Sequence, residues 1–205
     1  MKGYRVNEIY SSVQGQGHRA GTDNIFLRFS GCNLRCAMKK GPKSPGGFDC
    51  DTEFESGRTL TPSEVVDWIA TEAERGDIKW VIATGGEPML QLDSLLVSML
   101  HAHGFKIAVE TNGTRVVQSD IDYVCISPKV AEHCIVQRKA DEVRYVRGYG
   151  QAIPMTVVKA KHQYISPAFT GEILEERTYR WCQQLIAENP DWRLSIQKHK
   201  LSNLR

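Results

Sequence analysis

The sequence predicts an α/β fold in which helices cover the outside of a mostly parallel sheet. Two observations predict it: apolar runs of the buried-strand type alternate with amphipathic helical patterns, and glycines or polar residues follow each run. The length of 205 residues suits one domain. We therefore expect a single domain over residues 1–205, with a sheet that is either open or partly closed as a barrel.

The amino-terminal part contains two expected strands, at 6–10 and 25–29. In the second, alternation of apolar and polar residues would place Arg28 on the face opposite its apolar neighbours. The segment 14–17 between them has two glycines, which permit a turn or the close approach of a ligand. A loop at 37–49, rich in glycine, proline and lysine, follows the second strand.

A clear helical signal begins at Thr61. This residue is a good N-cap, Pro62 suits the first helical position, and Glu64 can complete a capping box. The inward face of this helix is expected to contain Val65, Val66, Ile69 and Ala70. A second helix is expected at 92–103, ending before Gly104. Its expected inward residues are Leu95, Leu96, Met99 and Leu100.

Three apolar runs, at 80–83, 105–109 and 123–126, are expected to be strands. The loops that follow them are 84–88, 110–113 and 127–129. Because ligand sites of parallel sheets lie at the carboxyl ends of the strands, we expect these loops to meet beside the cysteine-rich segment.

Signals are weaker after Lys129. Further strands are expected at 142–146 and 163–165, and a closing strand at 192–196. A helix is expected at 177–188, with Trp181, Leu185 and Ile186 on its buried side.

Composition and charge limit the classes of partner. The formal net charge is +2 without a long basic block, so nucleic acid is not needed to explain it. No apolar run approaches the roughly 18–20 residues that span a bilayer, and the amino terminus lacks a secretory signal. We expect a cytoplasmic protein that binds neither nucleic acid nor membrane.

Three of the six cysteines, Cys32, Cys36 and Cys50, lie within one segment. Tetrahedral zinc prefers four ligands in close pairs, and a redox thiol pair prefers two intervening residues. Three thiolates on a four-iron cluster leave one iron open to a small molecule. The residues favour such a cluster, while zinc or three unrelated thiols stay open. The remaining three are expected to be free thiols or small buried residues: Cys125, Cys134 and Cys182.

The cysteine segment resembles that of radical S-adenosylmethionine enzymes, although thirteen residues separate Cys36 from Cys50 where the usual signature has two. An insertion at 37–49 accounts for the difference. Eight motifs in order are similar to those of the 7-carboxy-7-deazaguanine synthase family: 14–17, Arg28, 31–34, 50–52, 84–88, 110–113, 127–129 and 192–200.

The resemblance implies an abridged, partial (β/α) barrel and a lyase. The family converts 6-carboxy-5,6,7,8-tetrahydropterin to 7-carboxy-7-deazaguanine and ammonia, by hydrogen abstraction at C6 and ring contraction. It implies three cofactors, a 4Fe-4S cluster, S-adenosylmethionine and Mg²⁺. It also implies a flavodoxin- or ferredoxin-type electron donor and a homodimer.

The resemblance also implies roles for individual residues. Those for the cluster are Cys32, Cys36 and Cys50, and the one for Mg²⁺ is Thr52. Those for S-adenosylmethionine are Gly85, Gly86, Glu87, Glu110, Asn112, Ser127, Pro128, Lys129 and Ser166. Those for the substrate are Val13, Gln14, Gly15, Gln16, Arg28, Thr84, His199 and Arg205, with His199 also the candidate catalytic residue. The chain departs from the family pattern at Gln16, at Ser166 and in its last five residues.

Two other functions compete with this interpretation. A glycyl-radical-enzyme activase would share the cysteine segment and the motif at 84–88, but not the motifs at 14–17 and 192–200. A non-catalytic iron–sulfur or zinc protein would need only the cysteines.

Overall fold

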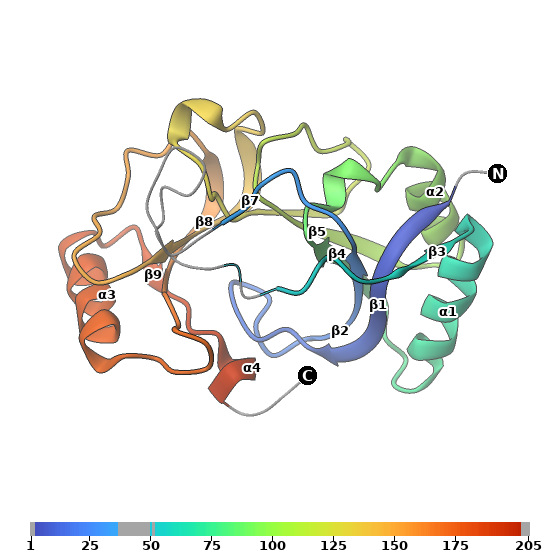
Figure 1. Cartoon of the computed structure of the whole chain (residues 1–205), viewed down its shortest axis with the longest axis horizontal. Helices are drawn as coiled ribbons and strands as arrows, with labels where there is room; N and C mark the ends of the chain where they lie inside the picture. The colour runs from blue at the N-terminus through green and yellow to red at the C-terminus, as the bar shows by residue number, and fades with distance from the viewer. Residues whose placement is uncertain (1–2, 37–49, 51, 202–205) are drawn as a thin grey trace.

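The computed structural model describes residues 3–36, 50 and 52–201. Within these residues nine strands form one sheet in the order β3-β1-β2-β4-β5-β6-β7-β8-β9 (Figure 1). The strands are β1 (Tyr4–Val13), β2 (Asp23–Phe29), β3 (Arg58–Leu60), β4 (Trp80–Gly85), β5 (Lys106–Thr111), β6 (Tyr123–Ile126), β7 (Lys139–Arg147), β8 (Lys159–Pro167) and β9 (Arg193–Leu194). The helices are α1 (Pro62–Glu74), η1 (Pro88–Leu90), α2 (Ser94–Ala102), η2 (Glu132–Cys134), α3 (Glu176–Glu188) and α4 (Lys198–Leu201).

The sheet confirms the predicted class, because β2 and β4 to β9 pair in parallel. It is open, since β3 and β9 each have one neighbour and do not pair with each other. At one edge, β1 runs antiparallel to both β2 and β3, an arrangement that the sequence pattern did not reveal. The closing strand is only two residues long, shorter than predicted.

The first helix begins as predicted. Thr61 Oγ1 accepts a hydrogen bond from Glu64 N at 3.3 Å, and Thr61 N donates to Glu64 Oε2 at 2.7 Å, which completes the capping box. The second helix begins later than predicted, after the N-cap Asp93. The inward placement of Leu95 is wrong: its side chain is 48% exposed, while Val97 is buried. Successive residues lie about 100° apart around a helix, so Leu95 and Val97 lie on opposite sides of Leu96.

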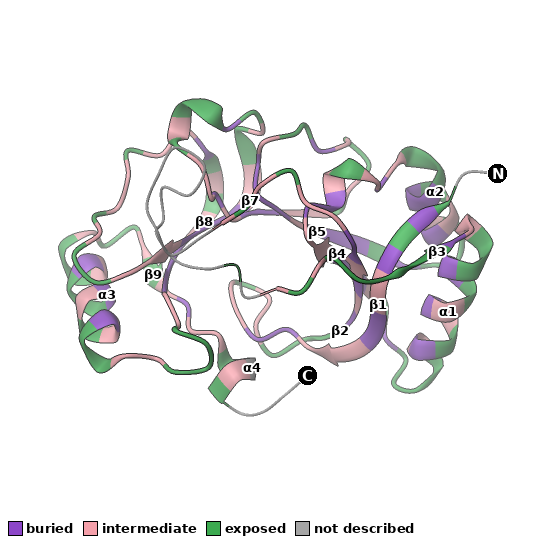
Figure 2. Ribbon diagram, in the orientation of Figure 1, coloured by how far each residue is buried: buried purple, intermediate pink, exposed green. Residues whose placement is uncertain are grey.

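Two apolar clusters hold the helices against the sheet, as the purple segments in Figure 2 show. The larger one packs α1 and α2 on β1, β2, β4 and β5, and the smaller one packs α3 on β7 and β8. In α3 Leu185 is buried, with Trp181 and Ile186 partly buried beside it, as predicted. Helices α1, α2 and α3 therefore cover one face of the sheet and leave the other face for a site.

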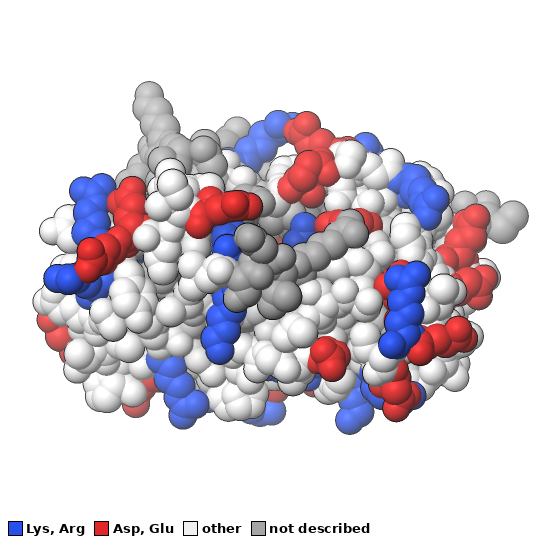
Figure 3. All heavy atoms as spheres, turned by 90° about the horizontal axis from the view of Figure 1, so that it is seen from below, with Lys and Arg blue, Asp and Glu red and all other residues white. Residues whose placement is uncertain are grey.

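Acidic and basic side chains are interspersed on the face that Figure 3 shows, consistent with the small formal net charge of +2. In the part of the chain that the structure describes, no helix has the length and apolar character of a membrane span.

Candidate active site

A pocket that contains all three clustered cysteines lies at the carboxyl ends of β2, β4, β5 and β6; we call it the cysteine pocket. Its lining consists of Gln16, Cys32, Leu34, Cys36, Cys50, Thr52, Thr84, Gly85, Gly86, Glu110, Thr111, Asn112, Ser127, Lys129, Arg144, Val146, Ala168, Phe169 and Gln197. The three loops that the sequence placed at one edge do meet beside the cysteines. This convergence was the central spatial prediction, and the structure confirms it.

The glycines at the end of β4, Gly85 and Gly86, allow the strand to lie directly on the cysteine segment. Gly86 N donates to Phe29 O at 3.1 Å, and Glu87 N donates to Gly31 O at 3.0 Å. A Cβ atom on Gly86 would lie 2.0 Å from Gly31 O and 3.1 Å from Cys32 Cβ. The glycine at this position is therefore required by the approach of two backbones, in addition to any ligand contact.

Glu87 is fully buried behind the pocket and does not line it. Its carboxylate accepts hydrogen bonds from Thr111 Oγ1 at 2.7 Å, Asn112 N at 2.8 Å and Met89 N at 3.0 Å. Burial raises the pKa of Glu87, and these hydrogen bonds oppose the rise. Glu87 thus joins the loop after β4 to the loop after β5.

An amide network ties the cysteine segment to the end of β5. Asn112 Nδ2 donates to Asn33 Oδ1 at 3.0 Å, and Asn33 Nδ2 donates to Thr114 Oγ1 at 2.8 Å. Thr114 in turn donates from N and Oγ1 to Asn112 Oδ1. The side chain of Asn112 therefore orients the segment that contains Cys32, as well as lining the pocket.

The three cysteines differ in exposure. Cys32 and Cys36 are half-buried and Cys50 is exposed. Burial raises the pKa of the Cys32 thiol, and a backbone hydrogen bond from Leu34 N at 3.4 Å opposes it. The loop 37–49 lies outside the described residues.

The three thiols fit the requirement of a four-iron cluster. Among the described residues, no three His, Cys, Asp or Glu side chains lie close enough to hold one metal ion. A four-iron cluster places each thiolate on a different iron, so its ligands need only face one pocket. Cys32, Cys36 and Cys50 meet that requirement, since all three line the cysteine pocket.

Glu53 fixes the chain that returns from the cysteine segment to β3. Its carboxylate accepts hydrogen bonds from Asn7 Nδ2 at 2.6 Å, Glu55 N at 2.6 Å, and Ser56 N at 2.8 Å. The side-chain hydrogen bond from Ser56 is the largest of the causes that lower the pKa of Glu53 from 4.5 to about 2. This anchors the segment that follows Thr52 to β1.

The Glu53→Gln variant tests this anchor through pH. A carboxyl whose pKa is lower in the folded than in the unfolded chain contributes stability above its unfolded pKa of 4.5, and loses it as pH falls towards about 2. We expect the urea midpoint of the wild type to exceed that of Glu53→Gln at pH 6, and the two to converge near pH 2. Glu74→Gln, on the exposed side of α1, controls for loss of a carboxylate. A difference that stays constant over this range would contradict the assignment.

A second pocket adjoins the first; we call it the arginine pocket. It is lined by Tyr10, Val13, Gln14, Gly15, Gln16, Phe26, Arg28, Thr52, Thr84, Glu110, Gln197 and Lys200. Five residues line both pockets: Gln16, Thr52, Thr84, Glu110 and Gln197. Arg28 lies on the pocket side of β2, opposite its buried neighbours, and its Nη1 is 3.2 Å from Glu8 Oε1.

The pockets contain most of the residues expected from the sequence. Pro128 and Ser166 are buried and line neither pocket. The side chain of His199 and all of Arg205 lie outside the described residues. Sequence reasoning missed Arg144, a buried cation on β7 that lines the cysteine pocket. A signal existed, because Glu142 and Arg144 are charged residues two apart in the predicted strand 142–146, whose other residues are Val143, Tyr145 and Val146.

The fold and the cysteine pocket define a radical S-adenosylmethionine protein, and the model of the Radical SAM superfamily matches residues 27–129. A 7-carboxy-7-deazaguanine synthase of Bradyrhizobium diazoefficiens is 36% identical, with 98% of this chain and 99% of that protein covered. The synthase of Bacteroides thetaiotaomicron is also 36% identical, with 98% of each covered. The chain belongs to the 7-carboxy-7-deazaguanine synthase family.

A solved structure supports the fold independently. The crystal structure of QueE from Escherichia coli matches with a TM-score of 0.67 and 22% identity, covering 96% of this chain and 95% of that one. Membership of the superfamily makes the protein an enzyme and implies a 4Fe-4S cluster and S-adenosylmethionine as its cofactors.

Proposed function

We propose that this enzyme converts 6-carboxy-5,6,7,8-tetrahydropterin to 7-carboxy-7-deazaguanine with release of ammonia, as a carbon–nitrogen lyase. The observation that carries the proposal is the pair of adjoining pockets, which share five residues. A cofactor in the cysteine pocket would lie against a substrate in the arginine pocket. The reaction is a rearrangement with loss of ammonia, so it needs no net oxidant.

The cysteine pocket would hold both cofactors. Cys32, Cys36 and Cys50 would each bind one iron, and the fourth iron would take S-adenosylmethionine. When bound and reduced, this pair supplies the 5′-deoxyadenosyl radical that takes hydrogen from C6 of the pterin. The protein binds and orients the reactants and excludes side reactions. Glu87 would hold the loops after β4 and β5 together. The contacts to S-adenosylmethionine would come from the predicted residues that line the pocket: Gly85, Gly86, Glu110, Asn112, Ser127 and Lys129.

The arginine pocket would hold the pterin. Arg28 offers a guanidinium fork for the carboxylate, and Val13, Gln14, Gly15 and Gln16 would contact the ring. Thr52 lines both pockets, so its hydroxyl could help hold Mg²⁺ together with substrate oxygens. For His199 and Arg205 the substrate role stays a prediction, as does the cofactor role for Ser166 and Pro128.

The Arg28→Met variant tests the carboxylate contact. Losing a charge-assisted hydrogen-bond pair is expected to raise KM for the pterin about 10- to 100-fold, while the Kd for S-adenosylmethionine stays unchanged. Arg180→Met is the matched control, since Arg180 is an exposed arginine on α3. An unchanged KM, or equal losses for both ligands, would contradict this role for Arg28.

Anaerobic incubation of the reconstituted enzyme with S-adenosylmethionine, a reductant and the pterin tests the whole proposal. We expect 7-carboxy-7-deazaguanine and ammonia in equal amounts. Formation of 5′-deoxyadenosine without that product would refute the substrate while keeping the radical chemistry, as an activase would require. One zinc per chain and no iron–sulfur absorbance would refute the radical chemistry itself.

Several properties stay predictions from the sequence or from the family resemblance. They are the single domain over 1–205, the homodimer, the flavodoxin- or ferredoxin-type electron donor and the cytoplasmic location. Gel filtration tests the dimer, and replacement of the chemical reductant by reduced flavodoxin tests the donor.

A further inference from the structure

A set of three charges lies at the base of the two pockets, two of them buried and one partly exposed; we call Glu110, Arg144 and Glu142 the charge triad. Glu110 and Glu142 are aligned across the sheet, since Glu110 pairs with Cys125 on β6 and Cys125 pairs with Glu142 on β7. Arg144 is two residues beyond Glu142 on the same strand, so its side chain lies on the same face. Val143 and Tyr145, which alternate with them, belong to the core on the helix side.

The triad alternates in sign, with the cation between two carboxylates. Arg144 Nη2 is 2.8 Å from Glu110 Oε1, and Arg144 Nη1 is 3.5 Å from Glu142 Oε1. The exposed fractions are 3% for the side chain of Arg144, 2% for Glu142 and 19% for Glu110. The small side chain of Cys125 between the carboxylates leaves room for the guanidinium, and Arg144 Nη2 contacts its Sγ at 3.5 Å.

Stability alone does not account for these buried charges. A buried ion pair contributes little compared with an apolar set of the same volume, because desolvation offsets the attraction. Burial by itself would lower the pKa of Arg144, yet the surrounding groups, Glu110 and Glu142 among them, raise it, so the residue stays charged. The triad instead fixes geometry, because the planar guanidinium of Arg144 between two carboxylates leaves the three side chains few alternative positions.

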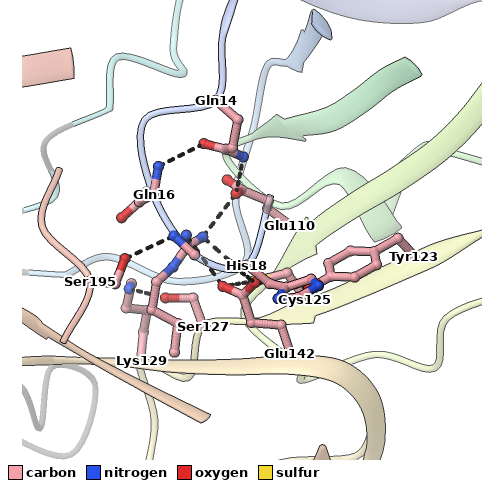
Figure 4. Close-up of polar contacts among 12 residues, drawn as sticks. Gln14, Gln16, His18, Glu110, Tyr123, Cys125, Ser127, Lys129, Glu142 and Ser195 are labelled. Carbon is pink, nitrogen blue, oxygen red and sulfur yellow. Dashed lines mark hydrogen bonds and ion pairs between the residues drawn. The ribbon is translucent and has the colours of Figure 1, made fainter. Parts of the chain in front are cut away.

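The carboxylates of the triad also hold the loop between β1 and β2 (Figure 4). His18 N donates to Glu142 Oε2 at 2.9 Å, and Gln14 Nε2 donates to Glu110 Oε1 at 3.0 Å. A Cβ atom on Gly17 would lie 2.2 Å from Glu142 Oε1, so this loop lies directly on the carboxylate. The same loop supplies Gln14, Gly15 and Gln16 to the arginine pocket. The triad thus joins one wall of the cysteine pocket to one wall of the arginine pocket.

We propose that Arg144 and Glu142 are positioning residues that hold Glu110 and the loop 14–18 in fixed relative positions. The wall of the cofactor pocket and the wall of the substrate pocket then keep one geometry. This inference rests on the proposed function for the identity of the two ligands. The contacts between triad and loop are made by protein groups alone, so they can be tested separately from ligand binding.

Hydrogen exchange of the ligand-free protein tests whether the triad holds the loop 14–18 in place. In Arg144→Met and in the isosteric Glu142→Gln, we expect the amide of His18, which donates to Glu142 Oε2, to exchange about tenfold faster or more, while those of α1 keep their protection. Lys161→Met, which removes an exposed basic residue from β8, is the control and should change neither. Unchanged exchange at the His18 amide in both folded variants would overturn the proposal.

Binding of S-adenosylmethionine to the reconstituted enzyme tests the action through Glu110. Arg144→Met is expected to raise the Kd about 10- to 100-fold, and Arg144→Lys less, because lysine keeps the charge but not the fork. In a Glu110→Gln background, Arg144→Met should have little further effect, whereas a purely structural role would give additive losses and overturn the proposal. Faster exchange of the His18 amide in the variants, together with no binding of S-adenosylmethionine to the wild type, would refute the cofactor assignment. The contact between the triad and the loop would still be supported.

Discussion

Replacing Cys32, Cys36 or Cys50 by alanine is expected to abolish the bound cluster and all turnover. Each thiolate would hold its own iron, and with two protein ligands left the cluster has no stable attachment. We expect iron in the reconstituted protein to fall from about four per chain to near zero. Iron and sulfide analysis with the absorbance of the anaerobic protein measures the loss.

Cys134→Ala is the matched control, since Cys134 is an exposed thiol outside both pockets. It should keep full iron content and activity. Retention of a four-iron cluster by Cys36→Ala would contradict the ligand set, and would direct the search for a third ligand to other residues.

The Gly86→Ala variant is expected to lose most of its turnover while most of the fold survives. The added Cβ would lie 2.0 Å from Gly31 O, a backbone atom that cannot move without displacing Cys32. We expect a stability loss of about 1–3 kcal/mol from overpacking. Displacement of a cluster ligand by about 1 Å is expected to lower kcat about a hundredfold.

Gly76→Ala is the control, because a Cβ there would meet its nearest atom, Ile78 Cγ1, at an ordinary 3.5 Å. Urea unfolding and turnover of the two variants separate stability from function. Wild-type activity of Gly86→Ala would contradict the close approach of β4 to the cysteine segment.

Much of the fold was predictable because it depends on local sequence signals and on the order of the strands along the chain. The capping box at Thr61 and Glu64 is a local signal, and the structure has it as expected. The loops at 84–88, 110–113 and 127–129 meet because consecutive parallel strands are neighbours, a rule that needs no tertiary information. The same rule predicts that the cysteine segment, which follows the strand expected at 25–29, lies beside these loops.

Other features depend on contacts that no local pattern encodes. Strand β3 has three residues and pairs with β1 from more than 50 positions away, so its sequence carries little strand signal. Leu95 and Val97 are both apolar, and only the packing of α2 decides which one is buried. The alternation in β7 puts Glu142 and Arg144 on one face, but only the sheet order reveals that this face lies beneath the pockets.

The glycines at 85–86 show a subtler difference between expectation and structure. Their sequence context indicates a backbone that approaches a ligand. In the structure they also bring β4 against Gly31 and Cys32, so the motif has a structural role in addition to any ligand contact.

Low-temperature electron paramagnetic resonance of the reconstituted, reduced protein, with and without S-adenosylmethionine, tests the central claim most directly. A cluster held by Cys32, Cys36 and Cys50 with one open iron predicts the spectrum of a reduced 4Fe-4S cluster, and the g values should shift when S-adenosylmethionine binds that iron. A cluster spectrum that S-adenosylmethionine leaves unchanged, or bound zinc in place of iron, would contradict the account.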